Sequence, residues 1–191
     1  MSKFEKIPTE LSGVVLVRPN VFPDERGFFL ESFNKREFAL AGLPDTYVQD
    51  NISHSRKGVI RGLHFQSNQA QGKLVKVLQG MIFDIVVDIR NGSPSFGHHI
   101  GIELSSKSPD MLFVPVGFAH GFLALEDDTE VLYKVTDFYA PQYDAGICWN
   151  DPFLDLRWPL AEFCISKVIV SPKDAALPSL NEIISPFTYG G

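Results

Sequence analysis

Short apolar or alternating runs, separated by turn residues, repeat along almost the whole chain. They are Gly13–Arg18, Phe28–Phe33, Thr46–Ser53, Val59–Gln66, Leu74–Gln79, Ile82–Ile89, His99–Leu104, Met111–Val114, Gly117–Leu125, Glu130–Phe138 and Ile147–Trp149. Runs of this length that recur about every 8–12 residues are typical of an all-β sandwich or barrel. We therefore expect an all-β fold, either a double-sheet jelly roll or a closed antiparallel barrel, which can enclose a small-molecule pocket.

Only two stretches have helical character. Lys35–Ala41 is followed by Gly42, a typical helix C-cap, and Ala175–Ile184 has a helical pattern that Pro178 interrupts. No strand alternates with a long helix, as a parallel α/β sheet requires. The chain has no internal repeat and no Gly/Ser-rich linker. We therefore expect residues 1–191 to form a single domain.

The composition argues against several classes of protein. The 17 Lys and Arg residues against 23 Asp and Glu give a net charge of −6, which argues against a nucleic-acid binder that relies on overall positive charge. No segment approaches the roughly 20 apolar residues of a membrane span. Residues 1–6 lack the apolar core of a signal peptide, and two cysteines are too few for a disulfide framework. We expect a cytoplasmic protein that binds neither nucleic acid nor membrane.

The densest group of chemically active side chains is Arg61-Gly62-Leu63-His64-Phe65-Gln66, within one predicted inner strand. Alternation along a strand puts His64 and Gln66 on one face and Arg61 on the other. A β-bulge at Gly62 would turn Arg61 to the same face as His64. A lone strand histidine is more often a core residue satisfied by a backbone carbonyl, but these neighbours make His64 a catalytic candidate.

The segment Pro115–Phe122 contains His120 and resembles the second motif of cupins, small β-barrels that often hold a metal. In metal-binding cupins the first motif supplies two histidines one residue apart, whereas this chain has His64 and then Gln66. Two imidazoles and an amide are a poor ligand set for zinc or iron. We therefore expect no bound metal.

Three further features supply candidate chemistry. Tyr133 shares a strand face with Val131 and Val135, and a phenol that faced His64 across a barrel would be a candidate general acid. Lys73 opens a predicted strand and, if it points inward, can stabilise negative charge on a substrate oxygen. An inward Asp84 is a candidate partner for Lys73. The segment 171–174 is by itself only a turn.

In combination these segments resemble the dTDP-4-dehydrorhamnose 3,5-epimerase family, over nearly the whole chain. The resemblance rests on Asp24–Phe29 with Glu31, Gln49–Asn51 with Ser53 and Ser55, Arg61–Gln66, Gln71–Leu74, Asp84–Arg90, Pro115–Phe122, Tyr133-Lys134 with Tyr139, Gly146–Pro152, Trp158-Pro159 and Ser171–Asp174. It implies a cupin-like jelly roll (a double-stranded β-helix). It also implies an isomerase, without metal or cofactor, that converts dTDP-4-dehydro-6-deoxy-D-glucose to dTDP-4-dehydro-L-rhamnose by inverting C3 and C5.

The resemblance assigns a role to each matching residue. It makes His64 the base, Asp174 the carboxylate that orients it, Tyr133 the acid and Lys73 the cation near the enolate oxygen. The implied substrate-binding residues are Arg26, Glu31, Gln49, Asn51, Arg61 beside the phosphates, His120, Tyr139 stacked on thymine, Asp144 and Lys173. Many relatives carry glutamate where this chain has Asp144. We expect the shorter carboxylate to contact the ligand through water or not at all.

The resemblance also implies a homodimer in which the N-terminal region pairs across the interface, so that Arg26 to Glu31 serve the neighbour's pocket. Four alternatives remain open: an epimerase of C3 or C5 alone, a ketoisomerase on the same dTDP-ketosugar, a sugar-nucleotide binding module without activity, and a metal cupin. The joint presence of His64, Tyr133 and Asp174 argues against the binding module. Gln66 argues against the metal cupin.

Overall fold

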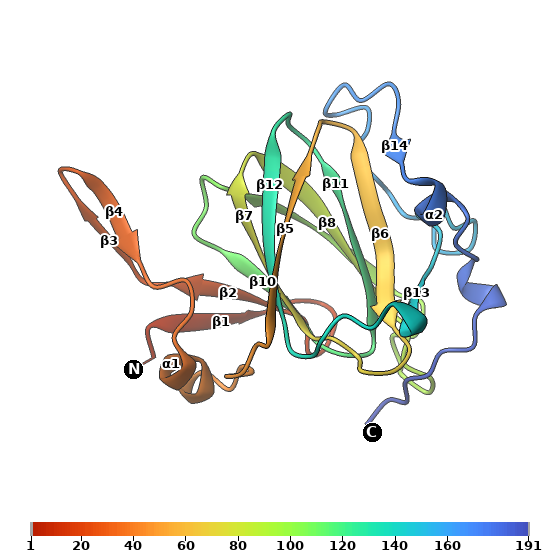
Figure 1. Ribbon diagram of the computed structural model, residues 1–191, viewed down its shortest axis with the longest axis horizontal. Coiled ribbons are helices and arrows are strands. Elements are labelled where there is room, and N and C mark those ends of the chain that lie inside the picture. Colours follow the sequence, from red (N-terminus) through yellow and green to blue (C-terminus); the bar gives the residue numbers. More distant parts are fainter. Residues whose placement is uncertain (1, 191) are drawn as a thin grey trace.

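Residues 2–190 of the computed structural model form two packed β-sheets, one projecting hairpin and a few short helices (Figure 1). The first sheet has the order β1 (Phe4–Pro8), β2 (Val15–Pro19), β10 (Met111–Val114), β7 (Lys73–Gln79), β12 (Thr129–Val135), β5 (Gln49–Ser55). The second has the order β13 (Asp144–Gly146), β6 (Val59–Gln66), β11 (Phe118–Ala124), β8 (Met81–Asp88), β9 (His99–Ser105). β14 (Ile169–Val170) pairs with β6 in parallel, and the other pairings are antiparallel.

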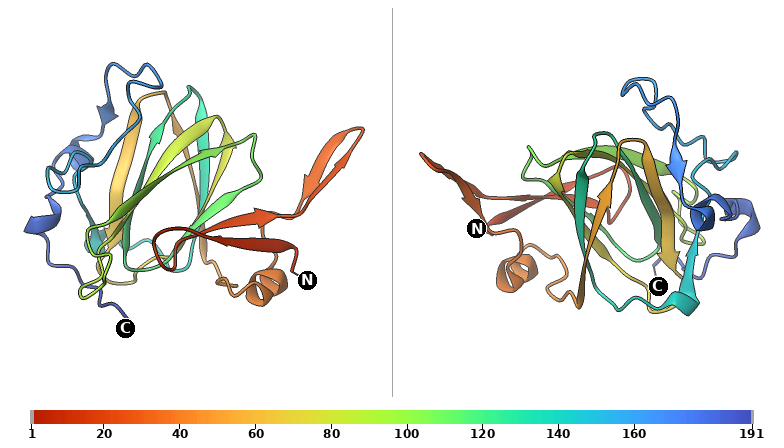
Figure 2. Two further views of the ribbon diagram at one scale, coloured as in Figure 1. Left: turned by 180° about the vertical axis from the view of Figure 1, so that it is seen from behind. Right: turned by 45° about the horizontal axis from the view of Figure 1, so that its top comes forward.

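A hairpin of β3 (Val21–Asp24) and β4 (Gly27–Leu30) projects from the body near the N-terminus (Figures 1 and 2). The helices are α1 (Lys35–Leu40), α2 (Pro172–Ala175) and two 3-10 turns at Pro141–Tyr143 and Leu180–Glu182. α1 begins after Asn34, whose side chain accepts hydrogen bonds from the first-turn N–H groups. Within residues 2–190 no helix has the length and apolar character needed to cross a membrane.

The main core lies between the two sheets. Val75 and Val131 of the first sheet meet Val86 and Phe122 of the second in one apolar cluster, and all four side chains are almost completely buried. Such burial is the main source of stability for a two-layer fold. α1 covers the outer face of the first sheet through Phe38, and the C-terminal segment covers the outer face of the second. Each sheet is therefore covered on its outer face by another part of the chain.

The predicted all-β jelly roll is confirmed, and the predicted helix at 35–41 is confirmed as α1. The predicted helix Ala175–Ile184 is wrong. α2 already ends at Ala175, and Pro178 lacks the N–H that a continuing helix needs. The predicted strand Ile147–Trp149 is also displaced, because the strand of this region is Asp144–Gly146. Ile147 only extends the pairing, by exchanging two backbone hydrogen bonds with Leu63.

Besides β13, three observed strands lie outside the predicted runs. β1 and β3 were not predicted, because their alternation is broken by charged residues and by Pro23. β14 is too short to give a periodic signal. The predicted strand Phe28–Phe33 corresponds to β4, which ends at Leu30. Its aromatic residues Phe28 and Phe29 are 68% and 65% exposed, so this hairpin contributes little to the core.

Candidate active site

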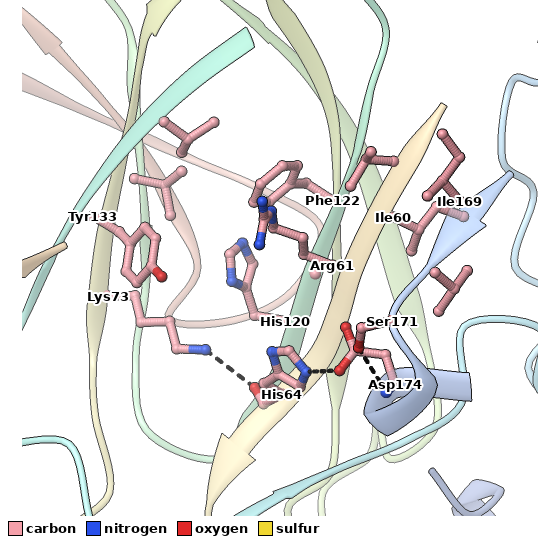
Figure 3. Close-up of a pocket in the computed structure, with 15 residues that line it drawn as sticks. Ile60, Arg61, His64, Lys73, His120, Phe122, Tyr133, Ile169, Ser171 and Asp174 are labelled. Atoms are coloured by element: carbon pink, nitrogen blue, oxygen red, sulfur yellow. Dashed lines mark hydrogen bonds and ion pairs between the residues drawn. The ribbon is translucent and has the colours of Figure 1, made fainter. Parts of the chain in front are cut away.

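A cavity of about 460 Å³ lies between the two sheets (Figure 3). Its chemically active lining residues are Lys73 of β7, Tyr133 of β12, Arg61 and His64 of β6, His120 of β11 and Asp174 of α2. A second hollow of about 320 Å³ adjoins it and shares His64, Lys73 and Tyr133. The second hollow adds Gln49, Asn51, Tyr139, Asp144 and Lys173. The fold thus brings together every predicted site residue except Arg26 and Glu31.

A β-bulge in β6 brings Arg61 to the same cavity as His64. In the pairing with β11, His64 lies opposite His120 and Arg61 lies opposite Phe122, so β6 has one extra residue between the pairs. Gly62 has a φ of +116°, and a Cβ there would lie 2.5 Å from the Cα of Gly121. Only glycine tolerates both the dihedral and the contact. The predicted bulge at Gly62 is confirmed.

Arg61 is held from behind by β5. Its Nε donates to Oγ of Ser55 at 3.0 Å, and its Nη2 donates to the carbonyl of His54 at 2.9 Å. These two bonds restrain the guanidinium and leave its remaining donors for a ligand. A guanidinium fixed in this way suits bidentate binding of an anion such as phosphate.

His64 and Asp174 form a hydrogen-bonded pair at one wall of the cavity. Nε2 of His64 lies 2.8 Å from Oδ1 of Asp174, while Oδ2 accepts from the N–H of Gly62 at 3.2 Å. The Asp174 side chain is only 7% exposed. Burial acts to raise its pKa, but the hydrogen bonds and charge of His64 outweigh this, so the pKa is lowered. An ionised Asp174 makes Nε2 the protonated nitrogen of His64, which leaves Nδ1 as the base.

Tyr133 and Lys73 reach the cavity from the opposite sheet (Figure 3). Burial raises the pKa of Tyr133, although the charge of Arg61 acts against this, so the phenol keeps its proton at neutral pH. Burial lowers the pKa of Lys73 to about 8, with Asp84 and Asp144 opposing the shift. Nζ of Lys73 donates to the backbone carbonyl of His64 at 3.1 Å.

Asp84, which the sequence makes a candidate partner for Lys73, does not form an ion pair with that lysine. It lies beside His120 instead, with its Oδ1 2.7 Å from Nε2 of that histidine. The Asp84 side chain is fully buried and that of His120 is 8% exposed. The reason is topological, because β8 pairs directly with β11, whereas Lys73 lies on the facing sheet.

Side chains that line the second hollow are linked by a series of hydrogen bonds that runs from β5 to α2. Nε2 of Gln49 donates to Asn51 at 2.8 Å, and its Oε1 accepts from the N–H of Tyr139 at 3.0 Å. The Tyr139 hydroxyl donates to Oδ2 of Asp144 at 2.8 Å, and Lys173 donates to the same oxygen. The bond to Asp144 raises the pKa of Tyr139 and that of Lys173. This series holds an aromatic ring and a cation next to the cavity.

Arg26 and Glu31 lie outside the cavity of this chain. Arg26 is at the tip of the β3–β4 hairpin, where it pairs with Asp24 at 2.6 Å and its side chain is 85% exposed. Glu31 accepts from Lys3 at 3.0 Å and from Asn34 at 3.1 Å. The hairpin does not pack into its own barrel, so the prediction that these residues serve a neighbouring pocket stays a prediction.

Gln66, which stands where a metal-binding cupin has its second histidine, has a structural role. Its Nε2 donates to the carbonyls of Gln69 and Phe138, and its Oε1 accepts from the N–H of Ala140 at 2.7 Å. The side chain is therefore committed to the loop before Pro141. Within residues 2–190 there is also no cluster of three His, Cys, Asp or Glu side chains arranged to hold a metal ion. The residues present do not fit a cupin metal site.

Two contributors to the site were not recognised from the sequence as such. Ser171 caps α2 by accepting from the N–H of Asp174 at 3.0 Å, and it lines the cavity. A Ser-Pro step is typical of a helix start, although segment 171–174 by itself indicates only a turn. Ser55, which is 3% exposed, anchors Arg61. Its alternation with Asn51 and Gln49 on the inward face of β5 could have indicated this.

The arrangement suits removal and return of a proton at carbon. An oriented imidazole lies on one wall, and a protonated phenol and an ammonium group lie on the other. A base, an acid and a cation around one cavity are the groups needed for proton abstraction next to a carbonyl.

Comparison with known proteins gives a consistent result. A family model described as dTDP-4-dehydrorhamnose 3,5-epimerase matches residues 8–182. The dTDP-4-dehydrorhamnose 3,5-epimerase of Methanothermobacter thermautotrophicus is 47% identical over 182 residues, which cover 95% of this chain and 97% of the relative. The structure of the Legionella pneumophila dTDP-6-deoxy-D-glucose-3,5-epimerase in complex with dTDP-4-keto-L-rhamnose superposes with a TM-score of 0.91 and 46% identity. It covers 98% of this chain and 100% of that one.

A structure with lower sequence identity has the same fold but belongs to an enzyme that epimerises a single position. It is the 3'-monoepimerase ChmJ of Streptomyces bikiniensis in complex with dTDP-quinovose, with a TM-score of 0.84 and 28% identity. The matched regions cover 92% of this chain and 87% of ChmJ. The fold is therefore common to double and single epimerases, whereas the higher identities are to the 3,5-epimerases. With the family model matched across most of its length, this chain belongs to the dTDP-4-dehydrorhamnose 3,5-epimerase family.

Proposed function

We propose that the protein converts dTDP-4-dehydro-6-deoxy-D-glucose to dTDP-4-dehydro-L-rhamnose by inverting C3 and C5, in the biosynthesis of dTDP-L-rhamnose. The observation that carries this proposal is the placement of His64 and Tyr133 on facing sheets of one cavity. Both carbons flank the C4 ketone, so loss of a proton from either gives an enolate. Inversion then requires a new proton from the opposite side of the sugar.

His64 is the base in this proposal. Its Nε2 proton is bound to Asp174, so the free Nδ1 takes the proton from C3 or C5. Because Asp174 is buried and bonded to the Gly62 N–H, it fixes the ring before substrate arrives. It also stabilises the imidazolium that forms when the proton is taken.

Lys73 stabilises the negative charge that develops on the C4 oxygen. With a pKa of about 8 it is mostly an ammonium ion at neutral pH, and its burial strengthens its interaction with the enolate. Tyr133 then delivers its proton to the opposite face. Its raised pKa makes the neutral phenol the resting form, which is the form that a general acid requires.

The nucleotide part of the substrate occupies the second hollow and its rim. Arg61, which lines the first cavity, and Lys173, which lines the second hollow, supply positive charge for the diphosphate between them, although the chain as a whole carries −6. Tyr139 is half-exposed at the rim, where its ring can stack on thymine. Gln49, Asn51 and His120 are the remaining binding side chains of this chain, and the Asp144 carboxylate acts by holding Tyr139 and Lys173.

We further propose a homodimer in which the β3–β4 hairpin reaches the neighbour. Two features support it. The hairpin exposes Phe22, Phe28 and Phe29, and β5 is an edge strand whose outer side is unpaired within residues 2–190. A hairpin added at β5 would bring Arg26 and Glu31 towards the row of inward polar residues on that strand.

Mixed dimers test the exchange. Arg26→Ala and His64→Asn subunits are each expected to be weak or inactive alone. A mixed dimer with exchanged hairpins has one pocket with both native residues, so co-expression of the two variants should restore up to about a quarter of the activity. If co-expression restores nothing although purification through a different affinity tag on each variant isolates mixed dimers, the hairpins do not exchange.

We infer from the core shared by the two sheets that residues 1–191 act as one domain. We also propose that the enzyme acts in the cytoplasm, together with its nucleotide-sugar substrate. No nucleic-acid or membrane partner is proposed.

A proton NMR time course tests the reaction itself. Purified protein is mixed with dTDP-4-dehydro-6-deoxy-D-glucose in deuterated buffer that contains EDTA. We expect deuterium at both C3 and C5, and a product that a rhamnose-forming reductase accepts. Exchange at one carbon alone would identify a single-site epimerase, and a product without the C4 ketone would identify a ketoisomerase. Without exchange at either carbon the protein is a binding module, and activity that EDTA abolishes would indicate a metal enzyme.

A further inference from the structure

Asp151 is a buried carboxylate that lies outside both hollows of the candidate active site and is only 3% exposed. Its Oδ1 accepts hydrogen bonds from the N–H groups of Phe153 at 2.7 Å and Leu154 at 3.1 Å. Its Oδ2 accepts from the N–H of Leu180 at 2.6 Å. A carboxylate is costly to bury unless its oxygens are hydrogen-bonded. The two oxygens therefore bind two different parts of the chain, the local turn and a segment 29 residues further along.

The chain between α2 and Leu180 is held against the same loop at two further points. The carbonyl of Pro178 accepts from the N–H of Cys148 at 2.8 Å. The Leu177 side chain packs against Gly146, where an added Cβ would lie only 2.8 Å from Cδ1 of that leucine. These contacts, together with the bond to Leu180, fix the path by which the chain leaves α2.

That path determines where the Asp174 carboxylate lies. α2 (Pro172–Ala175) has only four residues, and a helix of that length does not hold its position without contacts from outside. The N–H of Leu177 donates to the carbonyl of Asp174 at 3.3 Å, so the turn that carries the carboxylate continues directly into the anchored segment. From this turn Asp174 reaches Nε2 of His64 at 2.8 Å (Figure 3).

The other contacts of α2 are local, short or exposed. Ser171 accepts from an N–H group within the same helix, and β14 pairs with β6 over only two residues. Lys173 forms an ion pair at the rim, but its side chain is 58% exposed, and exposed pairs contribute little to stability. The buried bond from Asp151 to Leu180 is therefore the anchor of α2 that is best shielded from water.

The two leucines whose N–H groups bind this carboxylate also pack behind the base. The side chains of Leu154 and Leu180 are buried in one apolar cluster on the outer face of the second sheet. Leu63 and Phe65 belong to the same cluster, and they flank His64 on β6. The carboxylate thus connects the back of the strand that carries the base to the segment that carries its orienting partner.

We propose that Asp151 is a positioning residue of this site, which holds the segment after α2 through the Leu180 N–H and thereby places the Asp174 carboxylate against His64. It does not touch the substrate. A hydrogen bond of this kind weakens steeply when its partners move apart, and a misplacement of about 1 Å can cost about 10²-fold in rate. The kinetic part of the inference rests on the proposed function, but the bond between Asp174 and His64 can be measured without turnover.

The test compares Asp151→Asn with the wild type and with Asp155→Asn. The remaining oxygen of Asn suffices for the local turn at Phe153 and Leu154, whereas the amide group that replaces Oδ2 cannot accept from the N–H of Leu180. Asp155 is a matched control from the same loop, because its side chain is 79% exposed and Asn tolerates its φ of 47°.

Proton NMR measures the outcome directly. A ring N–H that is bonded to a carboxylate is shielded from exchange with water and gives a separate downfield signal, which His64→Asn identifies. We expect this signal in the wild type and in Asp155→Asn, and its loss or broadening in Asp151→Asn. Amide exchange at Leu180 should become at least about tenfold faster in Asp151→Asn, which shows that the anchor is released. An unchanged ring signal despite a released Leu180 would overturn the proposal.

Kinetics separate positioning from a general structural defect. In Asp151→Asn we expect kcat to fall roughly 10- to 100-fold. The Kd for dTDP should change by less than about threefold, because Arg61 and Tyr139 are held from β5 and the long, exposed Lys173 side chain can follow the phosphate. Equal losses in dTDP affinity and in kcat would make Asp151 a merely structural residue.

A second variant keeps the proposal testable if Asp151→Asn does not fold. Leu177→Ala removes the packing against Gly146, which is the next anchor of the same segment. We expect a weaker ring N–H signal and a kcat about fivefold lower, again with little change in the Kd for dTDP. An unaffected signal and kcat would contradict the proposal. If the ring signal responds as expected but the wild type does not turn over the dTDP-ketosugar, the proposed function fails while this inference stands.

Discussion

The two walls of the cavity differ in how firmly they hold their catalytic side chain. On the second sheet, His64 is hydrogen-bonded to Asp174. The Asp174 carboxylate also accepts from the N–H of Gly62, and Ser171 accepts from the backbone N–H of Asp174. On the first sheet, Tyr133 is held by packing of its ring against the apolar inter-sheet cluster. A base must be oriented before it attacks a C–H bond, whereas an acid needs only to keep its proton and reach the enolate. The difference therefore matches the two roles.

The largest expected effect comes from removing the base on the restrained wall. His64→Asn should lower kcat by about 10⁴-fold, since it removes the imidazole that Asp174 orients as the base. The affinity for dTDP should stay within about threefold, because His64 meets the sugar and not the nucleotide. Steady-state kinetics and calorimetric titration with dTDP measure the two effects. Activity near the wild-type level would end the assignment of the base.

Removing only the restraint should cost less than removing the base. Asp174→Asn keeps the size of the side chain but lets the imidazole adopt the other tautomer, and we expect kcat to fall about 10³-fold. Ser171→Ala is a milder companion variant, because it removes only the cap of α2 and should cost less than tenfold. Wild-type kcat in Asp174→Asn would show that the base needs no orientation.

On the opposite wall, Lys73→Met should lower kcat about 10²-fold by removing a donor to the enolate oxygen. The wild type should also lose activity as the pH rises through about 8, because the folded pKa of Lys73 is lowered to that value and only the ammonium form helps. Below that pH the group is protonated and contributes fully. A kcat profile that stays flat to pH 9.5 would contradict this role.

The smallest expected effect lies at the rim, outside both walls. Lys173→Ala removes one cation for the diphosphate and one donor to Asp144, and it should raise KM and the Kd for dTDP about tenfold while kcat changes little. Lys35→Ala, on α1 and remote from the cavity, is the matched control. A loss in kcat larger than the loss in affinity would mean that Lys173 acts on the reacting sugar.

Alternation and turn chemistry predicted most strands, and Gly62 between Arg61 and His64 predicted the bulge that unites these two side chains. These signals are local, because each of them depends only on residues within or next to one strand. The resemblance named the remaining site residues but not their geometry. The contact of Asp174 with His64 joins residues 110 positions apart and depends on where α2 packs. Periodicity holds no information on that packing.

The departures from prediction have a common cause. The region after residue 144 is shaped by single contacts, such as the exchange of hydrogen bonds between Ile147 and Leu63, and not by a repeating pattern. Asp84 is a second example, because its partner was decided by which strands are neighbours. Strand order, which the sequence did not reveal, places His120 beside Asp84 and Lys73 on the facing sheet.

The central claim is that the two walls carry out two separate proton transfers, and Tyr133→Phe tests it most directly. The variant is incubated with dTDP-4-dehydro-6-deoxy-D-glucose in deuterated buffer, and NMR follows both solvent exchange and inversion at C3 and C5. The account predicts that deuterium still enters the substrate through His64 while inverted product forms at least about 10²-fold more slowly than with the wild type. Inverted product at the wild-type rate, or loss of exchange and inversion together, would contradict it.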